Sequence, residues 1–112
     1  MIQETTYLNE VKFRNQLRKD VVANKVGASV ANKSDRYTGG YIHVESHWNE
    51  QGWFKISYSA RNWDNSTLAH RNAQINLALT QMLHLLGYEI KIVEERGWNR
   101  QMEKVALYRK AE

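Results

Sequence analysis

His43, Glu45 and His47 alternate along one short segment, and on a strand this spacing would place all three on one face. Imidazole and carboxylate groups bind zinc, and a histidine beside a carboxylate can also work as a general acid–base pair. The two histidines of such a strand lie about 13 Å apart, so a shared ion would need a bent or bulged strand. We therefore expect neither a metal ion nor a catalytic residue here. The three side chains remain the candidates if the protein is a nuclease.

Other enzyme signatures are missing from the sequence. The pair Gly39-Gly40 lacks the frame of a phosphate-binding loop, and no Gly-x-Ser-x-Gly or His-Glu-x-x-His motif occurs. The chain has no cysteine, which excludes a thiol nucleophile, a disulfide framework and a cysteine-based zinc site. We expect no cofactor, and we favour a binding protein over an enzyme.

A second group of residues suits binding better than catalysis. In Arg96-Gly97-Trp98-Asn99-Arg100 a tryptophan stands between two arginines in a predicted turn. An indole can stack on a nucleobase while guanidinium groups pair with phosphates, as in single-strand binders. The same side chains would serve equally well as an anchor in a protein pocket. We expect Trp98 to be exposed, and Trp48 and Trp53, at the other predicted turn, to fold back over an open end of the core.

Positive charge is concentrated in the first third of the chain. Between residues 10 and 36 there are seven lysines and arginines against three acidic residues, and the formal net charge of the whole chain is +4. A localised basic segment can meet phosphate groups or an acidic protein surface. The residues expected to contact such a partner are Arg14, Arg18, Lys25, Lys33, Arg36, Lys55, Arg61, Arg96, Trp98 and Arg100.

The size and composition are those of one globular domain, expected to span residues 1–112. The mean hydropathy of -0.69 argues against a transmembrane helix, as does the lack of a long apolar run. The N-terminal residues carry no signal-peptide pattern. We therefore expect a cytoplasmic protein without membrane contact, located in the host cell if it is encoded by a phage.

Two helices are predicted from apolar spacing. The first runs from about Thr6 to about Lys25, with apolar residues one turn apart at Phe13, Leu17 and Val21 and a broader arc that includes Tyr7, Val11 and Val22. The second begins with Asn65 or Ser66 as its cap and ends before Gly87, a residue suited to a left-handed C-terminal position. Its buried stripe is expected to comprise Leu68, Ile75, Leu79, Met82, Leu83 and Leu86.

The opposite face of the second helix is poor in charge, because Arg71 is the only formally charged residue between Ser66 and Leu86. An exposed helix normally carries more charge, so this face is either partly covered or forms an interface with a partner or a second copy. Its residues are Ala73, Gln74, Leu77, Gln81, His84 and Leu85.

Two hairpins complete the prediction. In residues 41–61 two alternating strands surround a turn, and if Val44 lies opposite Ile56, then Glu45 lies opposite Lys55. A short extended piece is expected at residues 28–31. The second hairpin pairs residues 88–95 with 102–110, and we expect Ile90, Ile92, Val105 and Leu107 to face the core. The resulting fold is α+β, in the order α-β-β-α-β-β, with a small antiparallel sheet of two hairpins and the helices on one face.

These observations favour a small non-enzymatic binding protein that engages an anionic partner, either nucleic acid or a protein complex that handles nucleic acid. The alternative is a protein–protein interaction module or small inhibitor, of phage or mobile-element type, that acts through the charge-poor face of the second helix and can form a homodimer. A third reading is a nuclease, metal-dependent or acid–base, that uses His43, Glu45 and His47. We identify no family resemblance in the sequence.

Overall fold

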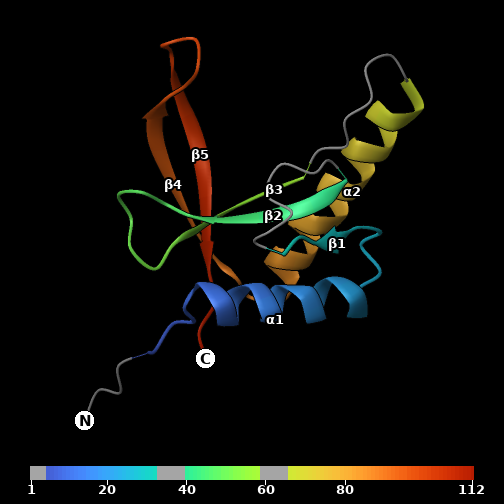
Figure 1. Cartoon of the computed structure of the whole chain (residues 1–112), viewed down its shortest axis with the longest axis horizontal. Coiled ribbons are helices and arrows are strands. Elements are labelled where there is room, and N and C mark those ends of the chain that lie inside the picture. The colour runs from blue at the N-terminus through green and yellow to red at the C-terminus, as the bar shows by residue number, and fades with distance from the viewer. Residues whose placement is uncertain (1–4, 33–39, 59–65) are drawn as a thin grey trace.

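The structure is a computed structural model that describes residues 5–32, 40–58 and 66–112. Its elements follow the order α1 (Glu10–Ala23), β1 (Ser29–Val30), β2 (Tyr41–Ser46), β3 (Phe54–Tyr58), α2 (Ser66–Leu85), β4 (Glu89–Arg96) and β5 (Met102–Arg109), as Figure 1 shows. The strands form one sheet in the order β1-β2-β3-β5-β4. The predicted α+β class is confirmed, but the sheet is mixed because β1, the short extended piece, pairs parallel with β2.

The core lies between the two helices and one face of the sheet. Buried residues of α1 and α2 join a single cluster with alternate residues of β2 and β3, among them Ile42, Val44 and Phe54. Because alternate strand residues point to the same side, both helices cover the same face of the sheet. Phe13 of α1 stacks on Phe54 with a centroid separation of 4.4 Å, which fixes the start of the helix against β3.

Helix α1 begins four residues later than the apolar spacing predicts. The side chain of Asn9 accepts a hydrogen bond from the backbone of Lys12 and caps the helix at that point. Tyr7, expected in the first turn, instead forms a bridge with Ala111 near the C-terminus. Phe13, Leu17 and Val21 are buried as predicted, whereas Val11 and Val22 are exposed and do not widen the apolar face. The helix ends at Ala23 in a Schellman arrangement, in which the amides of Lys25 and Val26 donate to the carbonyls of Val22 and Val21.

The first hairpin has the predicted register. Val44 lies opposite Ile56 and Glu45 lies opposite Lys55. Lys55 nevertheless places its ammonium group 3.6 Å from Glu95 of β4. Lys55 therefore links the first hairpin to the second.

Helix α2 confirms the predicted stripe at four of its described residues, but the prediction that Leu86 is buried was wrong. Ile75, Leu79, Met82 and Leu83 are buried, while Leu86 is 38% exposed. Gly87 follows the helix with a φ of +75°, and its amide and that of Tyr88 bond back to the last turn. The predicted cap at Asn65 and the side chain of Leu68 lie outside the described residues. Within the described ranges no helix is long and apolar enough to cross a membrane.

The prediction that Ile90, Ile92, Val105 and Leu107 of the second hairpin all face the core was wrong. Ile90 pairs with Tyr108 and Ile92 with Ala106, so Val105 and Leu107 lie on the opposite face. Ile90 and Ile92 are 56% and 55% exposed, because this part of the sheet extends past the helices. Leu107 is fully buried on the other face, where the turn between β2 and β3 folds over β4.

Asp20 of α1 ties together distant parts of the chain. Its carboxylate accepts hydrogen bonds from the Tyr88 hydroxyl at 2.6 Å, the Lys110 ammonium at 2.9 Å and the Gln16 amide at 3.1 Å. Burial raises the pKa of Asp20. The hydrogen bonds from Tyr88 and Lys110 and the charge of Lys110 together lower it by more, so the pKa of Asp20 lies below its ordinary value. The ionised form is therefore stabilised by folding.

We predict that Asp20→Asn lowers the free energy of unfolding at neutral pH by about 1–3 kcal/mol, because hydrogen bonds to a charged group are weakened. Since the folded-state pKa is depressed, this stability is fully present above about pH 4 and is lost as the pH falls through the folded-state pKa. The difference between the proteins should therefore shrink in acid. Urea unfolding near neutral pH and near pH 3 measures both effects, with the exposed Lys19→Ala as control. Equal stability of Asp20→Asn and wild type at neutral pH would contradict the assignment.

Candidate nucleic-acid interface

The hairpin of β4 and β5, residues 89–109, forms an arm that projects from the body of the protein (Figure 1). Strand β3 pairs in register with β5 only through Phe54 and Tyr108, near the base of the arm. Beyond that pair, β3 no longer runs beside the arm. The strands of the arm stay paired up to Arg96 and Met102. The turn of residues 97–101, here called the tip, is thus held away from the core by a continuous two-stranded ladder.

The backbone of the tip is fixed by its own hydrogen bonds. The amide of Gly97 donates to the carbonyl of Gln101 at 2.8 Å, and the amide of Arg100 donates to the carbonyl of Gly97 at 3.0 Å. The side chain of Asn99 accepts from the amide of Gln101 at 3.1 Å. Arg100 adopts a left-handed φ of +64° to close the turn. The side chains carried by this turn are therefore presented from a defined backbone.

Trp98 stands fully in solvent at the tip, with an exposed fraction of 102%. Arg96 and Arg100 are also exposed, and neither has an ion-pair partner among the salt bridges of the described residues. The expected exposure of Trp98 is confirmed. An indole surrounded by water is a large apolar surface that a partner could bury.

The turn between β2 and β3 crosses the outer face of β4 and forms what we call the clasp, residues 47–53. His47 Nε2 lies 3.0 Å from a carboxylate oxygen of Glu95, and Glu50 accepts from the Lys91 ammonium at 2.7 Å. The Nδ1 atom of His47 accepts from the amides of Asn49 and Glu50. Because Nδ1 is an acceptor, the ring proton must be on Nε2, where it donates to Glu95.

Glu95 is the arm residue on which the clasp converges. The hydrogen bond from His47 lowers its pKa most; burial raises it by less, and nearby Lys55 lowers it further, so the net pKa lies below its ordinary value. Glu95 is therefore held as a carboxylate. Glu95 lies directly opposite Glu103 on the paired strand, and two carboxylates in this position repel each other. The contacts of Glu95 with His47 and Lys55 compensate this repulsion.

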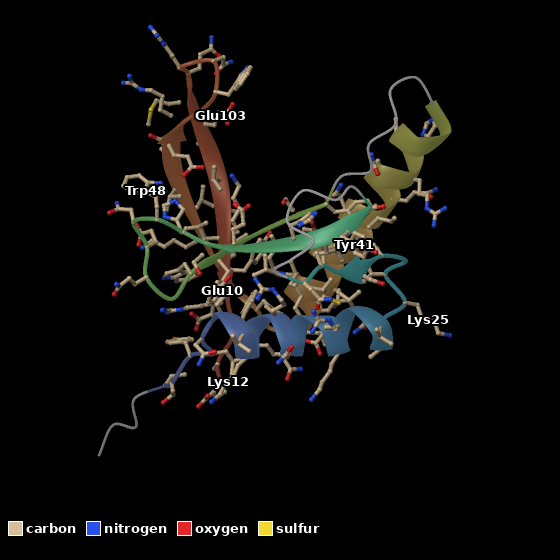
Figure 2. All side chains as sticks on the ribbon, in the orientation of Figure 1. Glu10, Lys12, Lys25, Tyr41, Trp48 and Glu103 are labelled. Atoms are coloured by element: carbon tan, nitrogen blue, oxygen red, sulfur yellow. The ribbon has the colours of Figure 1, made fainter. Side chains whose placement is uncertain are left out.

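The expectation that Trp48 would fold back over the core was wrong. Trp48 is 82% exposed and stacks on the His47 ring, with centroids 5.7 Å apart. Figure 2 shows Trp48 beside the arm, and Glu103 farther along the arm toward the tip. Trp53 is half-buried as expected, with the guanidinium group of Arg109 4.3 Å from its ring centroid.

The structure separates His47 from His43 and Glu45, the other two residues predicted for a reactive face. Both nitrogens of His47 are used by the clasp. His43 and the exposed Glu45 both line a pocket of about 210 Å³, together with Glu10 and Arg14. No cluster of three metal-ligating side chains occurs within residues 5–32, 40–58 and 66–112. The clasp role of His47 was missed because its partner Glu95 is distant in sequence and no local pattern marks it.

The predicted basic residues do not gather around the tip. Arg14 is largely buried and bonds to Glu10 and to the carbonyl of Val44. Arg18 donates to Asn15 and Asn32. These two arginines belong to α1, which lies at the opposite end of the molecule from the tip (Figure 1).

Other predicted contact residues are scattered or undescribed. Lys25 is exposed at the end of α1, and Lys55 contributes to the clasp through Glu95. Lys33, Arg36 and Arg61 lie outside the described residues. Of the ten predicted contact residues, the structure therefore brings together Arg96, Trp98 and Arg100.

The charge-poor face of α2 is exposed along its described length. Ala73, Gln74, Gln81 and His84 face solvent. Leu77 is 59% exposed and Leu85 is 81% exposed. No family model, curated protein or solved structure matches the chain, so the arm and this helix face are interpreted from their geometry alone.

We predict that His47→Ala lowers the free energy of unfolding by about 1–3 kcal/mol, because two turn amides and Glu95 lose their partner. Thermal or urea unfolding measures the change. Glu45→Ala, two residues earlier in β2 and exposed, is the control and should change stability by less than about 0.5 kcal/mol. If the two variants are equally stable, the clasp does not hold the arm.

Proposed function

We propose that the protein binds single-stranded nucleic acid through the tip of the arm. The observation that carries this proposal is the complete exposure of Trp98 between the exposed Arg96 and Arg100. Stacking of a nucleobase on an aromatic ring contributes about 1–3 kcal/mol and tolerates any base. The flanking arginines supply donors for the phosphates on either side of a stacked base.

Trp48 provides a second stacking surface near the first. His47 contacts Glu95, and Trp98 follows Glu95 by three residues, a distance of about 10 Å along an extended strand. The indoles of Trp48 and Trp98 are therefore both within reach of one short single strand. Stacking of Trp48 on His47 leaves most of the indole free, since 82% of the residue is exposed.

The charges of the arm favour a small number of phosphate contacts. Beside Arg96 and Arg100, the arm carries acidic residues at Glu94, Glu95 and Glu103. A surface of mixed charge does not attract a polyanion as a continuous basic groove does. We therefore assign most of the affinity to base stacking and a smaller part to the two arginines.

We predict that Trp98→Ala weakens binding to a single-stranded oligonucleotide by about 5–150-fold, the loss of one stacked base. Fluorescence anisotropy with labelled single- and double-stranded DNA and RNA measures it, with the probes checked for cleavage. Trp98→Phe keeps an aromatic ring and should retain most of the affinity. Unchanged binding by Trp98→Ala would contradict the role of the tip, and cleavage of the probe would instead support the nuclease reading.

The salt dependence of binding tests the arginines separately. For single strands the logarithm of the association constant falls with the logarithm of salt concentration by about 0.7 per phosphate contact, so two arginines predict a slope of about −1.4. Arg96→Ala and Arg100→Ala should each make this slope less steep by about 0.7. Arg71→Ala, an equal change of charge on α2, is the control and should leave the slope unchanged. A much steeper slope that persists in both tip variants would place the phosphate contacts on another surface.

A protein partner on α2 is the second candidate. Leu77 and Leu85 are exposed on a helix face that carries little charge, which is typical of an interface. Failure of wild-type protein to bind any of the four probes at low salt would favour this surface over the tip.

A further inference from the structure

The outer edge of β4 is the longest unpaired edge in the described part of the sheet. β4 is the last strand in the order and, within the described residues, pairs only with β5. The strand runs from Glu89 to Arg96, and such an edge carries a row of backbone donors and acceptors that can template another strand. On one face it also exposes Ile90 and Ile92. Regular, unpaired and partly apolar, this edge has the features of a strand-pairing site.

We propose that β4 pairs in antiparallel fashion with β4 of a second copy of this chain, around a two-fold axis at Val93. A two-fold axis between antiparallel strands keeps each face of the sheet continuous across the junction. The axis must therefore lie midway between one residue of β4 and the same residue of the second copy. The possible registers differ only in which residue lies at the axis. Two of them pair nearly the whole of β4, one centred on Ile92 and one on Val93.

Charge complementarity selects the register centred on Val93. It places Lys91 opposite Glu95 of the second copy, and the two-fold axis repeats this pair. Opposite charges at directly paired positions contribute about 0.2–1 kcal/mol each. Both side chains remain accessible despite their contacts with the clasp, since Lys91 is 42% and Glu95 is 24% exposed.

The three other registers nearest the middle of β4 oppose like charges. With the axis at Ile92, Glu89 would face Glu95 of the second copy, and with the axis at Lys91 or Glu94 that residue would face its own copy. In the register at Val93 the paired stretch is residues 90–96. It ends before Trp98, so the dimer does not depend on the role proposed for the tip.

The pairing also brings exposed isoleucines of the two copies onto one face, with Ile92 directly opposite Glu94 and Ile90 opposite Arg96 of the second copy. In the dimer β5 and β4 of both copies form one four-stranded ribbon, and the Ile92 side chains of the two copies become diagonal neighbours on the same face. Exposed apolar area on that face is then partly shared between the copies. A single exposed edge strand in a monomer would leave it in water.

Cysteine cross-linking tests the register, because the wild-type chain has no cysteine. In Val93→Cys the two thiols meet at the axis, where directly opposite Cβ atoms lie about 4.5–5.5 Å apart, close to disulfide distance. In Ile90→Cys the two thiols are six residues apart along the strands, about 20 Å, although this site is the more exposed. We expect oxidation to convert most of Val93→Cys, and little of Ile90→Cys, into a covalent dimer on a non-reducing gel.

Sedimentation equilibrium of the wild-type protein and of Leu77→Glu/Leu85→Glu completes the test. We expect a dimer in both, since the pairing does not use α2. A wild-type protein that is monomeric at all concentrations would overturn the proposal, and Lys91 would then act as a charge that protects the edge from pairing. Equal cross-linking at positions 90 and 93, or a dimer lost in the α2 variant, would also overturn it.

Discussion

The hydrogen bond between His47 and Glu95 is the contact on which the position of the arm and the clasp depends. It joins the turn of the first hairpin to the outer face of the second, which otherwise meets its neighbour β3 in register only at Phe54 and Tyr108. It also compensates a carboxylate that lies opposite Glu103. One neutral imidazole thus organises its own turn through Nδ1 and steadies the arm through Nε2.

This arrangement explains why the proposed binding surface is built from turns. Trp48 belongs to the turn that His47 organises, and Trp98 belongs to the turn that ends the arm. Neither ring is needed by the core, which is closed by the two helices and the inner face of the sheet. Both indoles are therefore exposed at positions that the fold supports but does not bury, which is the arrangement that a stacking surface requires.

The spacing of apolar residues predicted the helices and strands well, but it predicted the contacts between them less well. The burial of Ile75, Leu79, Met82 and Leu83 in α2 and the pairing of Val44 with Ile56 follow from spacing alone and are confirmed, whereas Leu86 of the predicted stripe is exposed. Alternation also assigns Ile90 and Ile92 to one face of β4, but it contains no information on how far the helices extend over that face. The start of α1 was missed although Asn9 is a strong capping residue, because the apolar spacing continues through Tyr7. The contact of His47 with Glu95 joins residues 48 positions apart, and no local pattern predicts it.

Stacking of a nucleic acid strand on Trp98 can be observed in an NMR titration of the tryptophan indole N–H signals with a short single-stranded oligonucleotide. The chain has four tryptophans, so each indole can be assigned by a single substitution. We expect the signals of Trp98 and Trp48 to shift together while that of Trp53, covered by Arg109, stays in place. A titration in which the Trp98 signal does not move would contradict this expectation.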